Sequence, residues 1–399
     1  MAGIRKFKST IASALSNKEI AGGAVIAIDR HGKELLSHAF GQTSLDDDAH
    51  LFDLDTTFWI ASSTKLLTAI CALQCVEKGL LKLDEDISTV LPEWKDPQIL
   101  TGFDGDGNAQ LRCATEKITL RRLLTHSSGM TYYFMNPLIM RWRDSQGLAV
   151  GTGRVAEYMN PLVFEPGSSW QYGPSIDWAG AMLEKVTGVT LGAYMQAHIF
   201  APLGMTHTTF RAKHDAEMRR RMVGRVGRNP TTGELIREES GLYPVKDNTD
   251  DLGGGGLYSC ARDYIKVLTS LLLDDGKLLG PAMHGELFRG QLEHPEAFAA
   301  AATNRVVGPL FSPAFAASRG ADSRWDYALG GAVVDKEVPG QAGKGTLYWG
   351  GLPNNNWWID RENGVCGFYA TWLLPPGDQI TGKLMAELQK AALKEVAKL

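Results

Sequence analysis

The pattern of hydrophobic and polar positions predicts a helix at the N-terminus and a β-hairpin directly after it. Hydrophobic side chains first recur three or four positions apart, at Ile4, Phe7, Ile11 and Leu15. This spacing places them on one face of a helix. Two β-rich runs follow, over 23–28 and 34–40, and the polar segment 29–32 between them ends in glycine. That arrangement is typical of a hairpin, so a sheet begins early in the chain.

An almost wholly apolar run over 64–77 predicts a central, buried helix. The run stops just before Gly79, and glycine commonly ends a helix at such a position. Between residues 80 and 240 we expect further helices at 118–124, 151–158 and 176–186, separated by Pro and Gly turns. These segments predict a helical layer in the middle of the chain.

Strand-like runs return near the C-terminus, over 345–349, 357–359 and 365–373, and an amphipathic helix is predicted over 381–399. Strands at both ends with helices between them indicate a mixed α/β (α+β) fold. We expect a discontinuous α/β sheet domain made of residues 1–60 and 240–399, with a mainly helical domain of residues 61–239 inserted into it. The active site would lie between the two domains.

The composition of the 399 residues is that of a globular protein. Lysine and arginine total 41 against 45 acidic residues, a net charge of -4, which gives no electrostatic basis for a nucleic-acid partner. No run approaches the roughly 18 consecutive apolar residues of a membrane span, so no membrane partner is expected. The five cysteines show no paired framework, which favours a reducing compartment and a cytoplasmic location.

The segment Ser62-Ser63-Thr64-Lys65 begins the predicted buried helix and carries the strongest chemical signal. Residues three apart share one helix face, so the Lys65 ammonium can reach the Ser62 hydroxyl. Free backbone N–H groups at a helix start also favour negative charge developing at the serine. By itself the tetrapeptide is weak evidence for a nucleophile, because a serine that simply caps the start of a helix gives the same pattern.

Other kinds of site lack support in the sequence. The nine histidines form no H-E-x-x-H pair or similar ligand spacing, so we expect neither a metal nor a cofactor. No G-x-S-x-G elbow is present, which argues against an α/β-hydrolase. His126 lies in a His-Ser-Ser-Gly segment that is typical of a turn at a helix end, and we interpret it as structural.

Further motifs follow the S-x-x-K segment in a fixed order. They are 78–85 (KGLLKLDE), 118–129 (ITLRRLLTHSSG), 165–167 (EPG), Tyr172 and 349–351 (WGG). In order and spacing this set resembles the serine β-lactamase and penicillin-binding protein superfamily, in its branch of class C β-lactamase-like esterases and acyltransferases. The segments 61–65, 170–180 and 349–354 resemble most the acyltransferases of the lovastatin pathway type. The resemblance implies an antiparallel sheet flanked by helices.

The resemblance also implies a role for each matching residue. Ser62 would be the nucleophile, Lys65 its charged partner and Tyr172 the general base. The backbone N–H groups of Ser62 and Leu352 would form an oxyanion hole, and the segment Trp349, Gly350 and Gly351 would bind substrate. Chemistry agrees with the choice of base, because no histidine lies in a nucleophile motif. A tyrosine, with an ordinary pKa near 10, can act as a base when a cation such as Lys65 favours its phenolate.

Two positions depart from the wider superfamily. The second motif usually has an asparagine two residues after the tyrosine, where this chain has Pro174, which offers neither a polar side chain nor an N–H. The third motif usually begins with lysine or histidine, where this chain has Trp349. An apolar ring therefore replaces a cationic contact to a substrate carboxylate, which disfavours β-lactams and D-Ala-D-Ala peptides as substrates.

These observations predict a serine acyltransferase of a secondary-metabolite pathway. It would take an acyl group from a thioester donor, carried by an acyl carrier protein domain of a polyketide synthase or a small mimic of it. The acceptor would be a small hydroxylated molecule bound in an apolar cleft, for which five tryptophans are candidates: Trp170, Trp178, Trp349, Trp357 and Trp358. Two alternatives stay open: a carboxylesterase that resolves the same acyl-enzyme with water, and a non-catalytic binding protein that keeps the fold.

Overall fold

Seven strands from the two ends of the chain form one antiparallel sheet in a computed structural model that describes residues 2–241, 244, 246–304, 308–311 and 325–398. The strand order is β2-β1-β13-β12-β11-β10-β9. The strands are β1 (Gly22–Asp29), β2 (Glu34–Gly41), β9 (Trp325–Ala328), β10 (Gly331–Val334), β11 (Leu347–Gly350), β12 (Asn356–Asp360) and β13 (Val365–Ala370). Because β1 pairs directly with β13, with Ile26 opposite Phe368, the two ends of the chain share one sheet as predicted.

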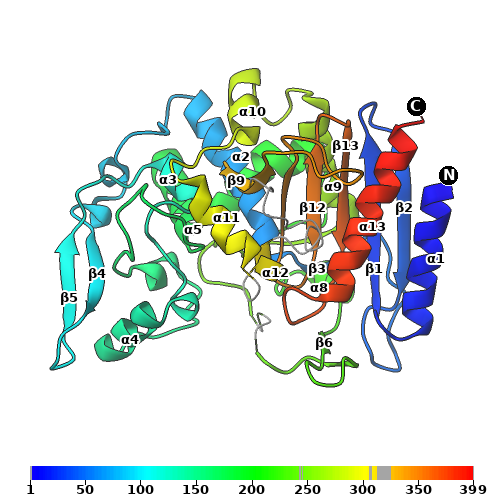
Figure 1. Cartoon of the computed structure of the whole chain (residues 1–399), viewed down its shortest axis with the longest axis horizontal. Helices are drawn as coiled ribbons and strands as arrows, with labels where there is room; N and C mark the ends of the chain where they lie inside the picture. Colours follow the sequence, from blue (N-terminus) through cyan, green and yellow to red (C-terminus); the bar gives the residue numbers. More distant parts are fainter. Residues whose placement is uncertain (1, 242–243, 245, 305–307, 312–324, 399) are drawn as a thin grey trace.

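Helices cover both faces of this sheet (Figure 1). α1 (Ala2–Ser16) and α13 (Gln379–Val396) pack together over one face, and α9 (Ala261–Leu273) packs against β1, β12 and β13 on the other. Every residue of β12 and β13 is consequently buried, which explains why these strands are near-continuous hydrophobic runs with little alternation. The mixed architecture and the N-terminal helix and hairpin agree with the sequence prediction.

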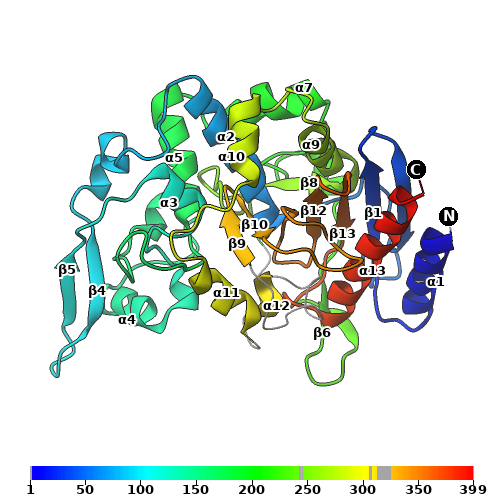
Figure 2. The same cartoon turned by 45° about the horizontal axis from the view of Figure 1, so that its top comes forward.

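The predicted buried helix is α2 (Thr64–Glu77), with the bounds expected from the sequence. Its residues from Thr64 to Cys75 are all buried. The chain leaves the helix through Gly79, whose φ of 70° is a left-handed conformation that glycine adopts without steric cost. α2 contacts α5, α6 and α10, so it lies at the centre of the molecule (Figure 2).

Most of the remaining helices and strands lie between α2 and β9 in the sequence. The helices are α3 (Leu120–Leu124), α4 (Pro137–Gln146), α5 (Ser175–Thr187), α6 (Leu191–Met195), α7 (Ala201–Leu203), α8 (Ala216–Arg220), α10 (Pro281–Phe288), α11 (Pro295–Thr303) and α12 (Gly308–Phe311). Three strand pairs accompany them: β3 (Thr57–Trp59) with β8 (Tyr258–Cys260), β4 (Gln98–Phe103) with β5 (Ala109–Cys113), and β6 (Val226–Arg228) with β7 (Leu235–Arg237). Within the described part of the chain, no helix is both long and apolar enough to cross a membrane.

Several sequence expectations for these regions were wrong. The helix expected over 151–158 is reduced to a 3₁₀ turn, η5 (Val155–Tyr158), because Gly151 and Gly153 both have φ of 70°. The β4–β5 and β6–β7 hairpins interrupt the expected helical layer, and β9 and β10 were not predicted. β11 begins at Leu347, after Gly345 with φ of 78°. The domain boundaries at residues 60 and 240 stay a prediction.

Candidate active site

Ser62 lies in a 3₁₀ turn, η1 (Ala61–Ser63), that joins β3 to α2. The preceding Ala61 has φ of 46°, a left-handed conformation that costs a residue with a Cβ about 1–2 kcal/mol. The Thr64 hydroxyl donates to the Ala61 carbonyl oxygen at 2.6 Å, and this hydrogen bond holds the turn. Ser62 is only partly buried and lines a cavity together with Ala61, whereas Ser63 is completely buried.

Lys65 follows one turn later and points back to the serine. Its Nζ donates to Ser62 Oγ at 3.2 Å and to the Gly254 carbonyl oxygen at 2.6 Å. A third, longer contact of 3.4 Å reaches the Tyr132 hydroxyl. The side chain of Lys65 is fully buried, so its ammonium depends on protein acceptors in place of water. The three-residue spacing predicted this contact between Ser62 and Lys65.

Tyr172 approaches Ser62 from the loop that precedes α5. Its hydroxyl lies 2.6 Å from Ser62 Oγ, within hydrogen-bond distance. Lys65 Nζ lies 4.6 Å from the centre of the Tyr172 ring, close enough for a cation–π attraction. Residues 62, 65 and 172 thus converge on one oxygen atom, although 110 residues separate Ser62 from Tyr172.

Ser62 and Tyr172 open into a cavity of about 860 Å³. The predicted substrate-binding residues all line it: Trp349, Gly350 and Gly351, together with Leu352. The Trp349 ring lies 5.5 Å from that of Tyr172, centre to centre. The apolar wall is therefore as expected, but its tryptophan content was overestimated. Of the five tryptophans proposed for the cleft, Trp349 and Trp357 line it, whereas Trp170, Trp178 and Trp358 pack outside it.

Comparison with known proteins assigns this geometry to a family. The sequence model described as Beta-lactamase matches residues 7–390. The chain belongs to the Beta-lactamase family. Its relatives include the lovastatin esterase of Penicillium rubens, 38% identical over 96% of this chain and 95% of that protein. They also include a monacolin J acid methylbutanoyltransferase of Aspergillus terreus, 35% identical over 95% of this chain and 92% of that protein.

The fold agrees with this assignment. Simvastatin synthase from Aspergillus terreus, in its unliganded form, superposes with a TM-score of 0.89 at 34% identity over 98% of both chains. The resemblance to class C β-lactamase-like acyltransferases and esterases is confirmed, and so is the penicillin-binding-protein-like fold. As a member of the family's acyltransferase and esterase group the chain is an enzyme, and the alternative of a non-catalytic binding protein is set aside.

Sequence reasoning missed four residues that support the site. Tyr132 and Gly254 contact Lys65, and Asp177 contacts both of them. Asn355 accepts a 2.7 Å hydrogen bond from the Ser63 hydroxyl. The glycine run 253–256 forms a turn that leads into β8. In the folded chain its carbonyl oxygens also accept hydrogen bonds from residues near the nucleophile.

Three successive carbonyl groups of that run point at residues of the nucleophile region. Thr68 Oγ1 donates to the Gly253 oxygen at 2.8 Å, Lys65 donates to the Gly254 oxygen, and Trp59 Nε1 donates to the Gly255 oxygen at 2.5 Å. Of these three carbonyl oxygens, the Gly254 oxygen is the one that contacts the lysine. The run of glycines in the sequence is the signal that could have indicated such a close approach of backbone.

His126 is completely buried beside the site. Its ring lies 4.7 Å from that of Tyr172, and among the described residues neither ring nitrogen has a hydrogen-bond partner. Burial, with a smaller contribution from the charge of Lys65, holds the pKa of His126 well below its usual 6.5. The ring is therefore neutral at pH 7 and makes no contact through which it could accept the Ser62 proton. This geometry fits the structural role expected from the sequence.

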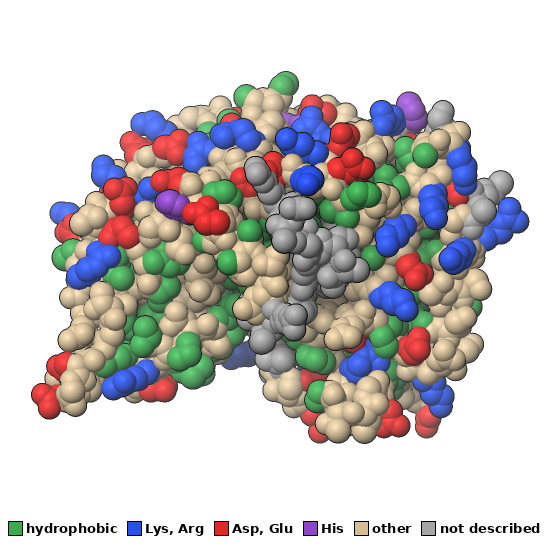
Figure 3. Space-filling model, viewed as in Figure 1, with side chains coloured by type: hydrophobic (Ala, Val, Ile, Leu, Met, Phe, Trp, Pro, Cys, Tyr) green, Lys and Arg blue, Asp and Glu red, His purple; other side chains and the backbone are tan. Residues whose placement is uncertain are grey.

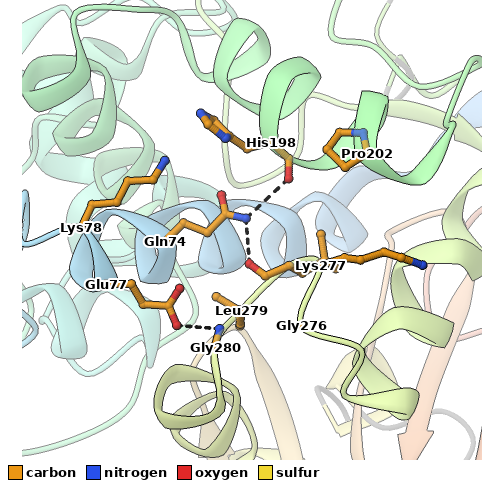
Figure 4. A pocket seen from close by; sticks show the side chains of 10 residues that line it. Gln74, Glu77, Lys78, His198, Pro202, Gly276, Lys277, Leu279 and Gly280 are labelled. Atoms are coloured by element: carbon orange, nitrogen blue, oxygen red, sulfur yellow. Dashed lines mark hydrogen bonds between the residues drawn. The ribbon is translucent and has the colours of Figure 1, made fainter.

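Two other features lie outside this cavity. Asp55, His207 and Cys260 bring potential metal-ligand atoms within 4.8 Å of one another, but Asp55 already accepts a 2.7 Å hydrogen bond from Arg262. A second cavity, of about 280 Å³, lies at the C-terminal end of α2, where Gln74 Nε2 donates to the carbonyl oxygens of His198 and Leu278 (Figure 4). None of the predicted site residues lines this cavity. The expectation of no metal and no cofactor stays a prediction.

Proposed function

We propose that the protein is a serine acyltransferase that transfers an acyl group from a thioester to a hydroxyl of a polyketide-like acceptor through an acyl-enzyme on Ser62. The observation that carries the proposal is the convergence of Tyr172 and Lys65 on Ser62 Oγ, at 2.6 and 3.2 Å. A serine nucleophile needs a base within hydrogen-bond distance and a neighbouring charge that activates that base. Tyr172 and Lys65 have the positions for those two roles.

In the first half-reaction Tyr172, as phenolate, takes the proton of Ser62 while Oγ attacks the thioester carbonyl. The tetrahedral intermediate collapses when the carbon–sulfur bond breaks, and Tyr172 returns the proton to the leaving sulfur. In the second half-reaction Tyr172 takes the proton of the acceptor hydroxyl, whose oxygen attacks the acyl-enzyme. The bond to Ser62 Oγ then breaks, Oγ regains the proton, and the new ester is free.

The oxyanion of each intermediate needs donors, and we assign the backbone N–H groups of Ser62 and Leu352 to this role. Both residues line the same cavity. A hydrogen bond ties their two segments together, because Ser63 donates to Asn355 Oδ1 at 2.7 Å and the Asn355 carbonyl oxygen accepts from Gly351 N at 2.8 Å. Donors held rigidly in this way stabilise developing charge without reorganising during the reaction.

An apolar acceptor fits the walls of the cavity. Tyr132, Phe134 and Trp349 line it, and Trp349 stands where the superfamily usually has a cation. Exposed hydrophobic residues continue from Phe134 to Leu138 and Met140 of α4, and Figure 3 shows hydrophobic side chains gathered around that part of the surface. The Aspergillus terreus relative is named for a monacolin J acid acceptor. For this chain we infer an acceptor of the same polyketide class.

For the acyl donor we infer a chemical class and no individual molecule. An acyl thioester is required by the chemistry, and a phosphopantetheine arm of an acyl carrier protein domain or a small-molecule mimic would present it. The five cysteines are all unpaired, which supports our inference that the reaction takes place in the cytoplasm. No nucleic-acid or membrane partner is part of this proposal.

A carboxylesterase is the second candidate, favoured by the 38% identity to the lovastatin esterase of Penicillium rubens. The two functions differ only in what resolves the acyl-enzyme. Water is present at about 55 M, so an alcohol prevails only when the site binds it in attack geometry, where effective molarities reach about 10⁵ M or more. The deciding experiment supplies a short acyl thioester with and without polyketide alcohols and quantifies ester against free acid. Ester should dominate with a fitting acceptor, whereas free acid across the whole panel would favour the esterase.

A further inference from the structure

The Lys65 ammonium is buried among uncharged acceptors. Its three hydrogen-bond acceptors are the Ser62 hydroxyl, the Gly254 carbonyl oxygen and the Tyr132 hydroxyl, and none of these is a carboxylate. An ammonium enclosed without a nearby anion carries a large desolvation penalty. The surroundings of Lys65 beyond these first contacts therefore decide whether its charge is stabilised.

Asp177 lies directly behind two of the three acceptors. Its Oδ1 accepts a 2.8 Å hydrogen bond from the Gly254 N–H, and its Oδ2 lies 3.5 Å from the Tyr132 hydroxyl. Gly254 thus faces Asp177 with its N–H and Lys65 with its carbonyl oxygen. Tyr132 likewise lies between the carboxylate and the ammonium. Both links from Lys65 lead to the same side chain, which is only 2% exposed.

The backbone at Gly254 is shaped around this carboxylate. A Cβ on Gly254 would overlap Asp177 Oδ2, with the other carboxylate atoms also too close. Glycine is therefore required for the loop to approach the carboxylate. Asp177 itself lies in the first turn of α5, five residues after Tyr172, so one short segment supplies both the phenol and the carboxylate.

Besides Tyr172, the proposed base, whose ring centre lies 4.6 Å from Lys65 Nζ, the titratable groups around this pair are Tyr132, Tyr158 and His126, and all three are neutral at pH 7. Burial, followed by the negative charge of Asp177, raises the pKa of Tyr132 and of Tyr158 well above 10. Burial holds the pKa of His126 well below 6.5. For Asp177 burial raises the pKa, while the charge of Lys65 and the Gly254 N–H oppose that rise. The Gly254 peptide and the neutral Tyr132 hydroxyl are the two groups that lie between Lys65 and Asp177.

We propose that Asp177 is a positioning residue that holds Lys65 in place and supplies its counter-charge through Gly254 and Tyr132. The inference rests on the proposed function, because it explains how the cation beside Ser62 and Tyr172 stays charged in an enclosed site. Asp177 touches neither of those two reacting groups. It acts on the reaction only through Lys65.

The test compares Asp177→Asn with Asp251→Asn. The asparagine at position 177 keeps the shape and can still accept from the Gly254 N–H, but it lacks the charge. Asp251 is a matched control, because it is a buried carboxylate near the same glycine run, accepting from Gly192 N at 2.8 Å and from Arg211 at 2.5 Å. For each variant we measure the rate of Ser62 acylation by a short acyl thioester from pH 6 to 10, with KM and the thermal unfolding midpoint.

Asp177→Asn should lower the acylation rate at pH 8 by about 10²-fold with KM changed less than about threefold. The alkaline limb of its pH–rate profile should move to lower pH by about one unit or more, because an ammonium without its counter-charge loses its proton more easily. Asp251→Asn should leave the shape of the profile unchanged. An unmoved alkaline limb in Asp177→Asn, or the same shift in Asp251→Asn, would overturn the inference.

Tyr132→Phe gives a second, independent reading should Asp177→Asn fail to fold. It removes one link between the charges and keeps the ring, so its alkaline limb should shift in the same direction by a smaller amount. A profile identical to that of the unmodified protein would contradict the inference. If the unmodified protein is never acylated on Ser62, the proposed function fails and the inference fails with it. If it is acylated normally and the variant profiles are unmoved, only the inference fails.

Discussion

The Ser63 hydroxyl donates a 2.7 Å hydrogen bond to Oδ1 of Asn355, a residue 292 positions further along the chain. Both side chains are completely buried. Asn355 Nδ2 also reaches the Ile60 carbonyl oxygen at 3.5 Å, on the other side of the nucleophile turn. One amide side chain thereby joins the turn that carries Ser62 to the loop that carries Leu352.

This link predicts that Ser63→Ala reduces turnover although Ser63 is not a reacting group. Removing the hydroxyl leaves a buried amide oxygen without its donor, which costs about 1–3 kcal/mol of folding free energy. We expect kcat to fall by about 10-fold or more, because the two oxyanion donors lose their common anchor. Ser259→Ala is the control. It removes a buried hydroxyl that contacts Thr208 at 2.8 Å, outside the cavity, and should cost stability with kcat unchanged. Equal losses of kcat in both variants would contradict the interpretation.

Lys65 and Tyr172 should act with Ser62 as a single unit. Lys65→Ala and Tyr172→Phe are each expected to lower kcat by several orders of magnitude, and the double variant by little more than either alone. Tyr327→Phe is the matched control, since its buried hydroxyl has no hydrogen-bond partner among the described residues and its ring contacts Trp349. A shared role would be contradicted if steady-state kinetics showed only a mild loss of kcat in each single variant and a loss in the double variant equal to the product of the two.

The buried neutral His126 should make stability depend on pH. Its pKa in the folded protein is well below 6.5, chiefly because of burial, whereas in the unfolded chain it titrates near 6.5. Below that pH the unfolded state takes up a proton that the folded state does not, so stability is lost as the pH falls. From pH 7.5 to 5.5 this loss amounts to about 1.4 kcal/mol.

His126→Asn should remove that part of the pH dependence. Asparagine is suited to the position, where φ is 58°, because it tolerates the left-handed region. Urea unfolding at several pH values would measure how steeply the free energy of unfolding changes with pH. A cavity left by the smaller side chain lowers that free energy equally at every pH and does not change its pH dependence. The same pH dependence of the free energy of unfolding in the variant and in the unmodified protein would show that His126 is protonated in the folded state.

Trp349 should favour transfer over hydrolysis. Its ring packs on Tyr172 and lies 6.0 Å from that of Phe311, so Trp349→Ala removes an apolar wall beside the acyl-enzyme. We expect the ratio of ester to free acid to fall by about 10-fold, because the acceptor loses contact area and water gains access. Trp94→Phe is the control, since the Trp94 ring packs against Trp178 outside the cavity, and this variant should leave the ratio unchanged. An unchanged ratio in Trp349→Ala would assign this ring to packing alone.

What the sequence could predict depended on how locally each feature is determined. The spacing of Ser62 and Lys65 placed their side chains together because both lie on one turn of chain, and α2 followed from a continuous apolar run ended by Gly79. Tyr172 and Leu352 were identified only through the order of motifs. Asp177 meets Gly254 across 77 residues and Ser63 meets Asn355 across 292, so these contacts arise only when the chain folds.

The misjudged elements have a similar cause. β4 and β5 pair with each other at the edge of the molecule, and β5 has mostly exposed residues, so its sequence lacks the hydrophobic signal of a core strand. The segment 151–158 has helical composition in part, but Gly151 and Gly153 adopt left-handed conformations that end the regular geometry. Local preference was overridden in each case by glycine or by the position of the segment in the fold.

The central claim is a covalent acyl group on Ser62, and intact-mass measurement tests it most directly. The protein and its Ser62→Ala variant are incubated with a short acyl thioester, quenched in acid and weighed, and the modified protein is digested to locate the added mass. We predict that one acyl group appears on the peptide containing Ser62 and that the variant gains none. An acyl group on another residue, together with full activity of Ser62→Ala, would contradict the account.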